Sequence, residues 1–195
     1  MNKITNILLV GVGGQGTILA SRVIGNAAIK SGMDVKISEI HGMAQRGGSV
    51  VTHVRFGEKV HAPTIEPGTA DILLAFEKLE ALRWIHYLRP GGNVIVNTRE
   101  IYPLPVLAGG EEYPGGIIES ISGKAEDVTT VDAFSLAVKS GSEKTLNTVL
   151  LGILAAKSGL DERIWKEAVS ETVPKKTIAI NLTAFETGFN LVTNP

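Results

Sequence analysis

A glycine-rich turn near the start of the chain constrains the fold more than any other feature. The apolar run from Ile7 to Val10 leads into Gly11, Gly13 and Gly16, which have G-x-G-x-x-G spacing, and a helical pattern follows. In a strand–turn–helix unit these glycines permit a tight turn and a close approach of the backbone to a diphosphate. The free N–H groups of the first helical turn favour an anion. The spacing therefore predicts a nucleotide-type binding turn.

The apolar periodicity predicts alternating strands and helices, followed by a run of helices. Strands are expected at 4–10, 34–40, 50–56, 71–76, 93–98 and 128–131, and helices at 15–30, 77–88, 117–125, 133–140, 144–157, 162–172 and 175–191. We further expect 60–65 to return beside 50–56 as a hairpin. This order predicts an α/β fold of Rossmann type: a mostly parallel sheet with flanking helices, a β-hairpin insertion and a helical C-terminal part. We expect a single domain spanning 1–195.

Composition excludes several classes of function. The 195-residue chain has 19 basic and 20 acidic residues, so its charge gives no reason to expect nucleic acid. It has no cysteine, which excludes disulfides, thiolate zinc sites and cysteine-ligated iron–sulfur clusters on this chain. Redox chemistry would then need an organic cofactor or a partner that carries the metal. The first apolar run is too short for a membrane span, and we expect a cytoplasmic protein.

A second glycine-rich segment, 41–49, follows the predicted second strand. Its place at the carboxyl end of that strand puts it at the binding crevice of such a fold. Arg46, between Gln45 and Gly47, can reach a phosphate or carboxylate past bare backbone. The alternative is a solvated arginine in a loop whose glycines only serve tight turns. Two interpretations of Glu39 stay open as well. It is either a ribose-binding acid, which is expected about 20 residues after the third glycine, or a solvated carboxylate at the end of a strand.

No self-sufficient catalytic set is visible in the sequence. It lacks a Gly-x-Ser-x-Gly elbow, a Gly-Lys-Ser/Thr phosphate loop and a His-Glu-x-x-His metal motif. His53 and His61 would face each other across the predicted hairpin, but no third ligand has useful spacing. We therefore expect surface histidines there and no metal site.

The two glycine-rich segments together resemble a known family. Gly-Val-Gly-Gly-Gln-Gly at 11–16 and Glu-Ile-His-Gly-Met-Ala-Gln-Arg-Gly-Gly-Ser-Val at 39–50 are similar to the gamma-type domain of 2-oxoacid:ferredoxin oxidoreductases. The second segment is closest to the indolepyruvate branch, that of the beta subunits of indolepyruvate ferredoxin oxidoreductases. The likeness covers essentially the whole chain, including 131–134 and 144–152.

The resemblance implies a specific function. Such enzymes decarboxylate a 2-oxoacid on thiamine diphosphate, pass electrons through iron–sulfur clusters to ferredoxin and release an acyl-coenzyme A. In the indolepyruvate branch the thiamine diphosphate and the 4Fe-4S clusters belong to a large alpha subunit, which agrees with the absence of cysteine here. This chain would then be the small subunit. It would complete the active site, possess no activity when isolated and contact coenzyme A or the partner.

By that analogy two groups of residues carry the site, while the catalytic residues stay unknown. The cofactor-binding group holds a phosphate-bearing ligand and consists of Gly11, Gly13, Gly14, Gln15, Gly16 and Thr17. The second group lies at the ligand or at the subunit interface and consists of Glu39, His41, Gly42, Met43, Gln45, Arg46, Gly47 and Gly48. The sequence does not separate those two roles for Arg46.

Two other classes of function fit parts of the pattern. A stand-alone NAD(P)-dependent oxidoreductase would use Gly11, Gly13, Gly16 and Glu39, although no residue pattern supplies a hydride-transfer partner. A purely structural subunit would leave the crevice empty. Neither the preferred 2-oxoacid nor the stoichiometry of a complex follows from the sequence.

Overall fold

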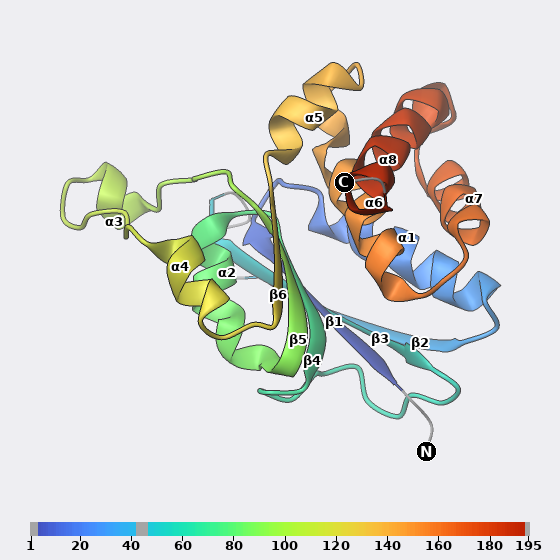
Figure 1. The fold of residues 1–195 in the computed structure, drawn as a ribbon, viewed down its shortest axis with the longest axis horizontal. Coiled ribbons are helices and arrows are strands. Elements are labelled where there is room, and N and C mark those ends of the chain that lie inside the picture. Colours follow the sequence, from blue (N-terminus) through green and yellow to red (C-terminus); the bar gives the residue numbers. More distant parts are fainter. Residues whose placement is uncertain (1–3, 42–46, 194–195) are drawn as a thin grey trace.

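Residues 4–41 and 47–193, which a computed structural model of the protein describes, form a six-stranded sheet with helices on both faces (Figure 1). The strands lie in the order β2-β3-β1-β4-β5-β6. Their bounds are β1 Thr5–Val12, β2 Asp34–His41, β3 Ser49–Gly57, β4 Ala70–Ala75, β5 Leu88–Asn97 and β6 Asp127–Val131. β1, β4, β5 and β6 pair in parallel, whereas β3 pairs antiparallel with both β1 and β2. The predicted α/β class with a mostly parallel sheet is confirmed.

The helices divide into two layers. One face of the sheet is covered by α1 Thr17–Lys30, α5 Ala133–Lys139, α6 Leu146–Ser158, α7 Glu162–Thr172 and α8 Ile178–Thr193 (Figure 1). The other face carries α2 Lys78–Trp84 and α4 Ile117–Ser122, and the short α3 Leu104–Leu107 projects beyond that layer (Figure 1). Three 3-10 turns lie at η1 Ile85–Tyr87, η2 Glu143–Thr145 and η3 Lys175–Thr177. The predicted helical C-terminal part is confirmed, and α7 has the predicted bounds.

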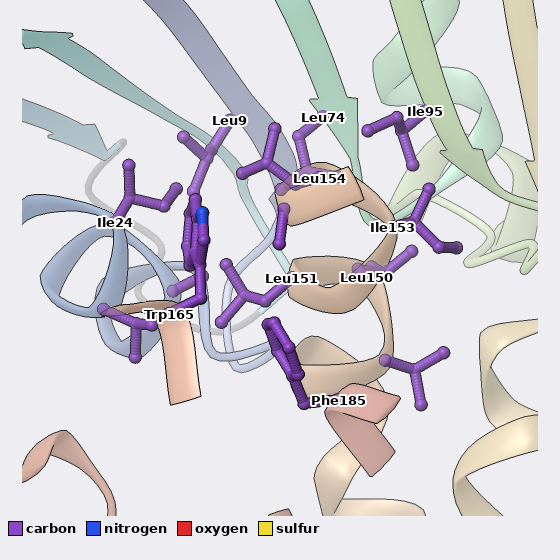
Figure 2. Close-up of a cluster of buried hydrophobic side chains, with 14 of the residues drawn as sticks. Leu9, Ile24, Leu74, Ile95, Leu150, Leu151, Ile153, Leu154, Trp165 and Phe185 are labelled. Carbon is purple, nitrogen blue, oxygen red and sulfur yellow. The ribbon is translucent and has the colours of Figure 1, made fainter. Parts of the chain in front are cut away.

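The larger of two hydrophobic core clusters in the described residues includes the contact between the sheet and α6, and the other lies between the sheet and the helices α2 and α4. Leu9, Leu74 and Ile95 project from β1, β4 and β5 towards Leu150 and Leu154 of α6 (Figure 2). All five side chains are fully buried, and each contributes about 1.5–3 kcal/mol relative to an exposed side chain. Because α6 carries apolar residues on opposite sides, it is buried by the sheet on one side and by α8 on the other. The central strands read as continuous apolar runs because both of their faces are covered.

The predicted hairpin between 50–56 and 60–65 is wrong. No strand lies in 58–69, and β3 instead inserts between β2 and β1. β3 is buried on both faces over most of its length, so it gains a pairing partner on each side. Arg55 holds the following segment over β3 by donating from Nη1 to the carbonyl oxygens of Ala62 and Thr64, at 2.9 and 3.0 Å. After β1 and α1 the chain therefore returns to the sheet as β2, which lies on the far side of β3 and is not a neighbour of β1.

His53 is buried, so the expectation of a surface histidine there is wrong. Its side chain is 3% exposed, and Nδ1 accepts a hydrogen bond from the backbone N–H of Ile65 at 3.1 Å. The ring meets that of Tyr87 edge to face. An accepting Nδ1 places the proton of the neutral imidazole on Nε2. Burial, and after it the charge of Arg55, lowers the pKa of His53 below its ordinary value of 6.5.

The lowered pKa of His53 predicts a pH dependence of stability. Because the folded protein prefers the neutral ring, the stability that His53 contributes is full above pH 6.5 and is lost as the pH falls through the folded-state pKa. Protonation also places a second donor opposite the Ile65 N–H. Urea unfolding at a series of pH values should show a steeper decline for the wild type than for His53→Asn, whose amide oxygen can replace Nδ1. His61→Gln, at an exposed position, is the control; equal slopes for wild type and His53→Asn would contradict the assignment.

Candidate phosphate-binding site

The glycine-rich turn lies at the carboxyl end of β1 and is fixed by side-chain hydrogen bonds. The amide oxygen Oε1 of Gln15 accepts from the backbone N–H of Val12 at 2.7 Å. Its Nε2 donates to the carbonyl oxygen of Phe76, just after β4, at 2.9 Å. The N–H of Gly13 donates to the carbonyl oxygen of Gly48 at 2.9 Å, which brings the end of the second glycine-rich segment beside the turn. Gln15 thus joins the turn to the neighbouring parallel strand.

Gly16 is the N-cap of α1 and needs to be a glycine for two reasons. Its φ of 82° lies in the left-handed region, which L side chains rarely adopt. A Cβ at this position would also lie 2.8 Å from Nδ2 of Asn147. No side chain caps α1, and its first turn contains no acid. The first N–H groups of this 14-residue helix therefore favour a negative charge at the turn.

A cavity of about 440 Å³ opens beside the turn. It is bordered by the turn, by the segment that follows β5 and by the start of α6; the lining residues are Gly13, Gly14, Gln15, Gly16, Arg99, Ile101, Glu143, Lys144, Leu146 and Asn147. The N-terminal ends of two long helices, α1 and α6, therefore border the same cavity. Both ends carry partial positive charge.

The side chains of the cavity favour an anion as well. Arg99 and Lys144 are exposed, and neither forms an ion pair within the described part of the chain. The Arg99 guanidinium lies 5.8 Å from the ring centroid of Phe134, a cation–π contact that orients it. Asn147 is only 6% exposed, and its Nδ2 donates to none of the residues at 4–41 or 47–193. The cavity is therefore lined by two cationic side chains and an amide donor, and by one carboxylate, that of Glu143.

The structure brings together part of the predicted first group. Gly13, Gly14, Gln15 and Gly16 line the cavity. Gly11 lies behind them, where a Cβ would be 2.8 Å from Oε1 of Gln15 and 3.0 Å from Cβ of Phe76. Thr17 is 5% exposed at the first position of α1.

The second group is described only in part. Gly42, Met43, Gln45 and Arg46 lie outside the described residues. His41 ends β2, where it pairs with Val50 of β3. Gly47 is exposed and Gly48 contacts the turn through its carbonyl oxygen. Their ligand or interface role stays a prediction.

Glu39 does not line the cavity. It accepts a hydrogen bond from the hydroxyl of Ser21 in α1 at 3.0 Å and pairs with Thr52 of β3. Since β3 lies between β2 and β1, Glu39 is one strand further from the glycine turn than an acid on a strand directly beside β1.

Sequence reasoning missed Arg99, Lys144 and Asn147 as site residues. Arg99 follows a predicted strand at 93–98, and ligands of such sheets bind beyond the carboxyl ends of the strands. That rule singles out Arg99 once β5 is known to lie beside β4. Lys144 and Asn147 belong to the 144–152 segment of the family likeness, but only the packing of α6 shows that they reach the turn.

A buried acid near the site ties α2 to β3. Glu80, 3% exposed, accepts from the hydroxyl of Ser49 and forms an ion pair with Arg83 at 3.0 Å. Burial raises the pKa of Glu80, while the Ser49 hydrogen bond and the charge of Arg83 oppose the rise. Within 4–41 and 47–193, no three His, Asp or Glu side chains are grouped so that they can hold a metal ion.

Comparison with known proteins identifies the family. The sequence profile described as pyruvate ferredoxin/flavodoxin oxidoreductase matches residues 6–191. The chain belongs to this family. It is 43% identical to the indolepyruvate oxidoreductase subunit IorB of Thermococcus kodakarensis, over 94% of this chain and 93% of the relative. It is 42% identical to the subunit of the same name from Archaeoglobus fulgidus, over 95% of this chain and 94% of that protein.

A solved structure has the same fold. The gamma subunit of a keto/oxoacid ferredoxin oxidoreductase from Geobacter sulfurreducens superposes with a TM-score of 0.74 at 26% identity, covering 98% of this chain and 99% of the other. The family predicted from the two glycine-rich segments is thereby confirmed. None of the helices described here is both long and apolar enough to cross a membrane.

Proposed function

We propose that this chain is the small subunit of a cytoplasmic indolepyruvate-type 2-oxoacid:ferredoxin oxidoreductase, acting as one domain over 1–195. The relatives that share 42–43% of its residues along nearly their whole length carry the name of indolepyruvate oxidoreductase subunits. Its reaction is the oxidative decarboxylation of an aryl 2-oxoacid to an acyl-coenzyme A, with ferredoxin as electron acceptor. The chain has no cysteine for a cluster, so we assign the 4Fe-4S clusters to a large alpha subunit. The family resemblance assigns the thiamine diphosphate to the same subunit.

We assign the phosphates of coenzyme A to the cavity beside the glycine turn. The observation that carries this assignment is the convergence of two helix N-termini, two cations and one free amide donor on a single space of about 440 Å³. That volume suits a diphosphate-bearing part of a ligand rather than a metal ion. Coenzyme A would supply the thiol that takes the acyl group. The part of this chain is to bind and orient the phosphates, so that the thiol end extends towards the partner.

The NAD(P)-dependent alternative has less support. A dinucleotide site of this kind uses the carboxylate at the end of the second strand for the ribose. Here the Glu39 carboxylate accepts from Ser21, and β3 separates its strand from β1. Calorimetric titration of the chain with NAD and NADP would favour this alternative only if it detected tight binding.

Reconstitution tests the proposed function. With indolepyruvate and coenzyme A, the purified chain alone should not reduce a viologen dye. The large subunit alone should reduce the dye only slowly. Mixing the two should restore activity, because the coenzyme A site is then complete. Full activity of the large subunit alone would remove the proposal, and so would substrate oxidation by the isolated small chain.

A further inference from the structure

Glu77 is a buried carboxylate that does not line the cavity but contacts the segment that does. It follows Phe76, whose carbonyl oxygen binds Gln15 of the glycine turn, and its residue is 1% exposed. Its Oε2 accepts from the backbone N–H of Glu80 at 2.9 Å and so caps α2. Its Oε1 accepts from the backbone N–H of Ile101 at 3.2 Å and from the hydroxyl of Tyr113 at 2.6 Å. Three donors from three parts of the chain therefore converge on one carboxylate.

The neighbouring residue holds the same segment. The backbone N–H of Lys78 donates to the carbonyl oxygen of Arg99 at 3.2 Å, and its Nζ forms an ion pair with Glu100. Residues 99–101 are thus fixed at three successive positions by the start of α2. Arg99 and Ile101, the first and last of them, both line the cavity.

Tyr113 lies near the end of the mostly irregular segment 99–113, which begins at Arg99. Its ring lies 5.2 Å, centroid to centroid, from that of Tyr102, while its hydroxyl binds Glu77. Burial and the Glu77 carboxylate raise the pKa of Tyr113, so the phenol stays a donor to that carboxylate. Ile101 and Tyr113, which lie near the two ends of the segment 99–113, therefore both donate to the Glu77 carboxylate.

We propose that Glu77 is a positioning residue, which places Arg99 in the cavity and thereby sets the affinity for the phosphates of coenzyme A. The inference rests on the proposed function of the cavity. The two oxygens of the side chain accept on opposite sides, Oε2 from Glu80 N–H and Oε1 from Ile101 N–H and Tyr113. A glutamine must turn its NH₂ towards one of these sides, so the donors on that side lose their acceptor. The shape of the side chain is retained in that exchange.

Calorimetric titration of the full chain with coenzyme A, and separately with inorganic pyrophosphate, tests the proposal. Glu77→Gln should weaken binding of both about tenfold, since one charge-assisted contact is misplaced. Hydrogen exchange should show faster exchange of the Ile101 amide in the same variant. Asp71→Asn is the matched control, because it makes the same exchange at a hydrogen-bonded carboxylate at the start of β4, which accepts from the Asn6 N–H and from Arg89 and does not contact 99–101. Its affinity should equal that of the wild type.

A double-mutant cycle separates positioning from a general loss of structure. If Glu77 acts through Arg99, Glu77→Gln/Arg99→Ala should bind no more weakly than Arg99→Ala alone. Additive losses would overturn the proposal. If Glu77→Gln binds as tightly as the wild type while Arg99→Ala binds more weakly, the role of Glu77 is overturned and the proposed function of the cavity stands. Wild-type affinity in Arg99→Ala would remove both.

A milder variant keeps the test decisive if Glu77→Gln does not fold. Tyr113→Phe removes one of the three donors and keeps the carboxylate on Ile101 N–H. It should weaken binding in the same direction but by a smaller factor, and faster exchange at Ile101 should accompany the loss. Unchanged affinity together with faster exchange would show that the segment does not govern binding.

Discussion

Replacing Gly188 by alanine is expected to destabilise the protein by about 3 kcal/mol or more, the upper range for an overpacked core. α8 crosses α6 with its backbone in direct contact at two glycines. A Cβ at Gly188 would lie 2.0 Å from the carbonyl oxygen of Val149, and one at Gly152 would lie 2.1 Å from that of Phe185. Both obstacles are backbone atoms inside helices, so neither can rotate away. Only a separation of the two helices accommodates the methyl group.

Urea unfolding of Gly188→Ala measures this effect. Gly123→Ala is the matched control: it lies at the end of α4 with φ −71°, and its Cβ would come no nearer than 3.8 Å to the nearest atom. Alanine there should leave stability unchanged or raise it slightly. A Gly188→Ala protein within about 1 kcal/mol of the wild type, well below the typical cost of overpacking, would contradict the close helix contact.

The same contact matters for the site because α6 carries part of it. Asn147 lies one residue after the start of α6 and two residues before Val149, whose carbonyl oxygen faces Gly188. Thr148 donates to the side-chain oxygen of Asn181 in α8 at 2.7 Å, which adds a polar tie at the same crossing. A displaced α6 would therefore also move Asn147 and Lys144 away from the glycine turn. Stability and anion binding are expected to fall together in Gly188→Ala.

The class of the fold was predictable from local pattern, and the partner of β3 was not. Apolar runs and turn residues are properties of neighbouring positions, so β1, β4 and the helices of the second half were located correctly. The place of β3 depends on pairing with residues far along the chain, Thr5 and Asp34 among them. No local signal shows whether such a strand pairs with the strand before it in sequence, as β3 does with β2, or with the segment after it. The strand predicted to begin at 93 begins at Leu88, and its pairing with β4 shifts register before Asn93.

The candidate site was predictable to the same extent. The glycine spacing located the turn because its chemistry lies in consecutive residues. Gln15 was expected at the ligand, and the structure shows what else its amide does: it binds Val12 and Phe76. Arg99 and Lys144 come from elements that only the tertiary fold brings to the turn. Their charge was visible in the sequence, but their convergence was not.

Removing both cations of the cavity should raise the KM for coenzyme A about 100-fold in the reconstituted complex, with kcat nearly unchanged. A hydrogen bond to a charged group contributes about 1.5–3 kcal/mol, and both side chains are solvent-exposed, so about a factor of ten for each is the lower end of that range. The phosphates of coenzyme A take no part in acyl transfer, so the two cations should bind them equally well in the ground state and in the transition state. Arg99→Ala/Lys144→Ala removes this binding from both states. Such a loss appears in KM rather than in kcat.

Lys139→Ala is the control for charge alone. Lys139 is an exposed lysine of α5 that lines a different depression, beside Asp132 and Leu191. Its removal lowers the net charge of the chain by the same unit as Lys144→Ala but leaves the cavity intact, so its KM should equal that of the wild type. The wild-type KM should also rise with added salt, and that dependence should be weaker in the double variant because two of the charges that salt screens are gone. A double variant with an unchanged KM would show that coenzyme A binds elsewhere in the complex, and the cavity would then have to serve another anion.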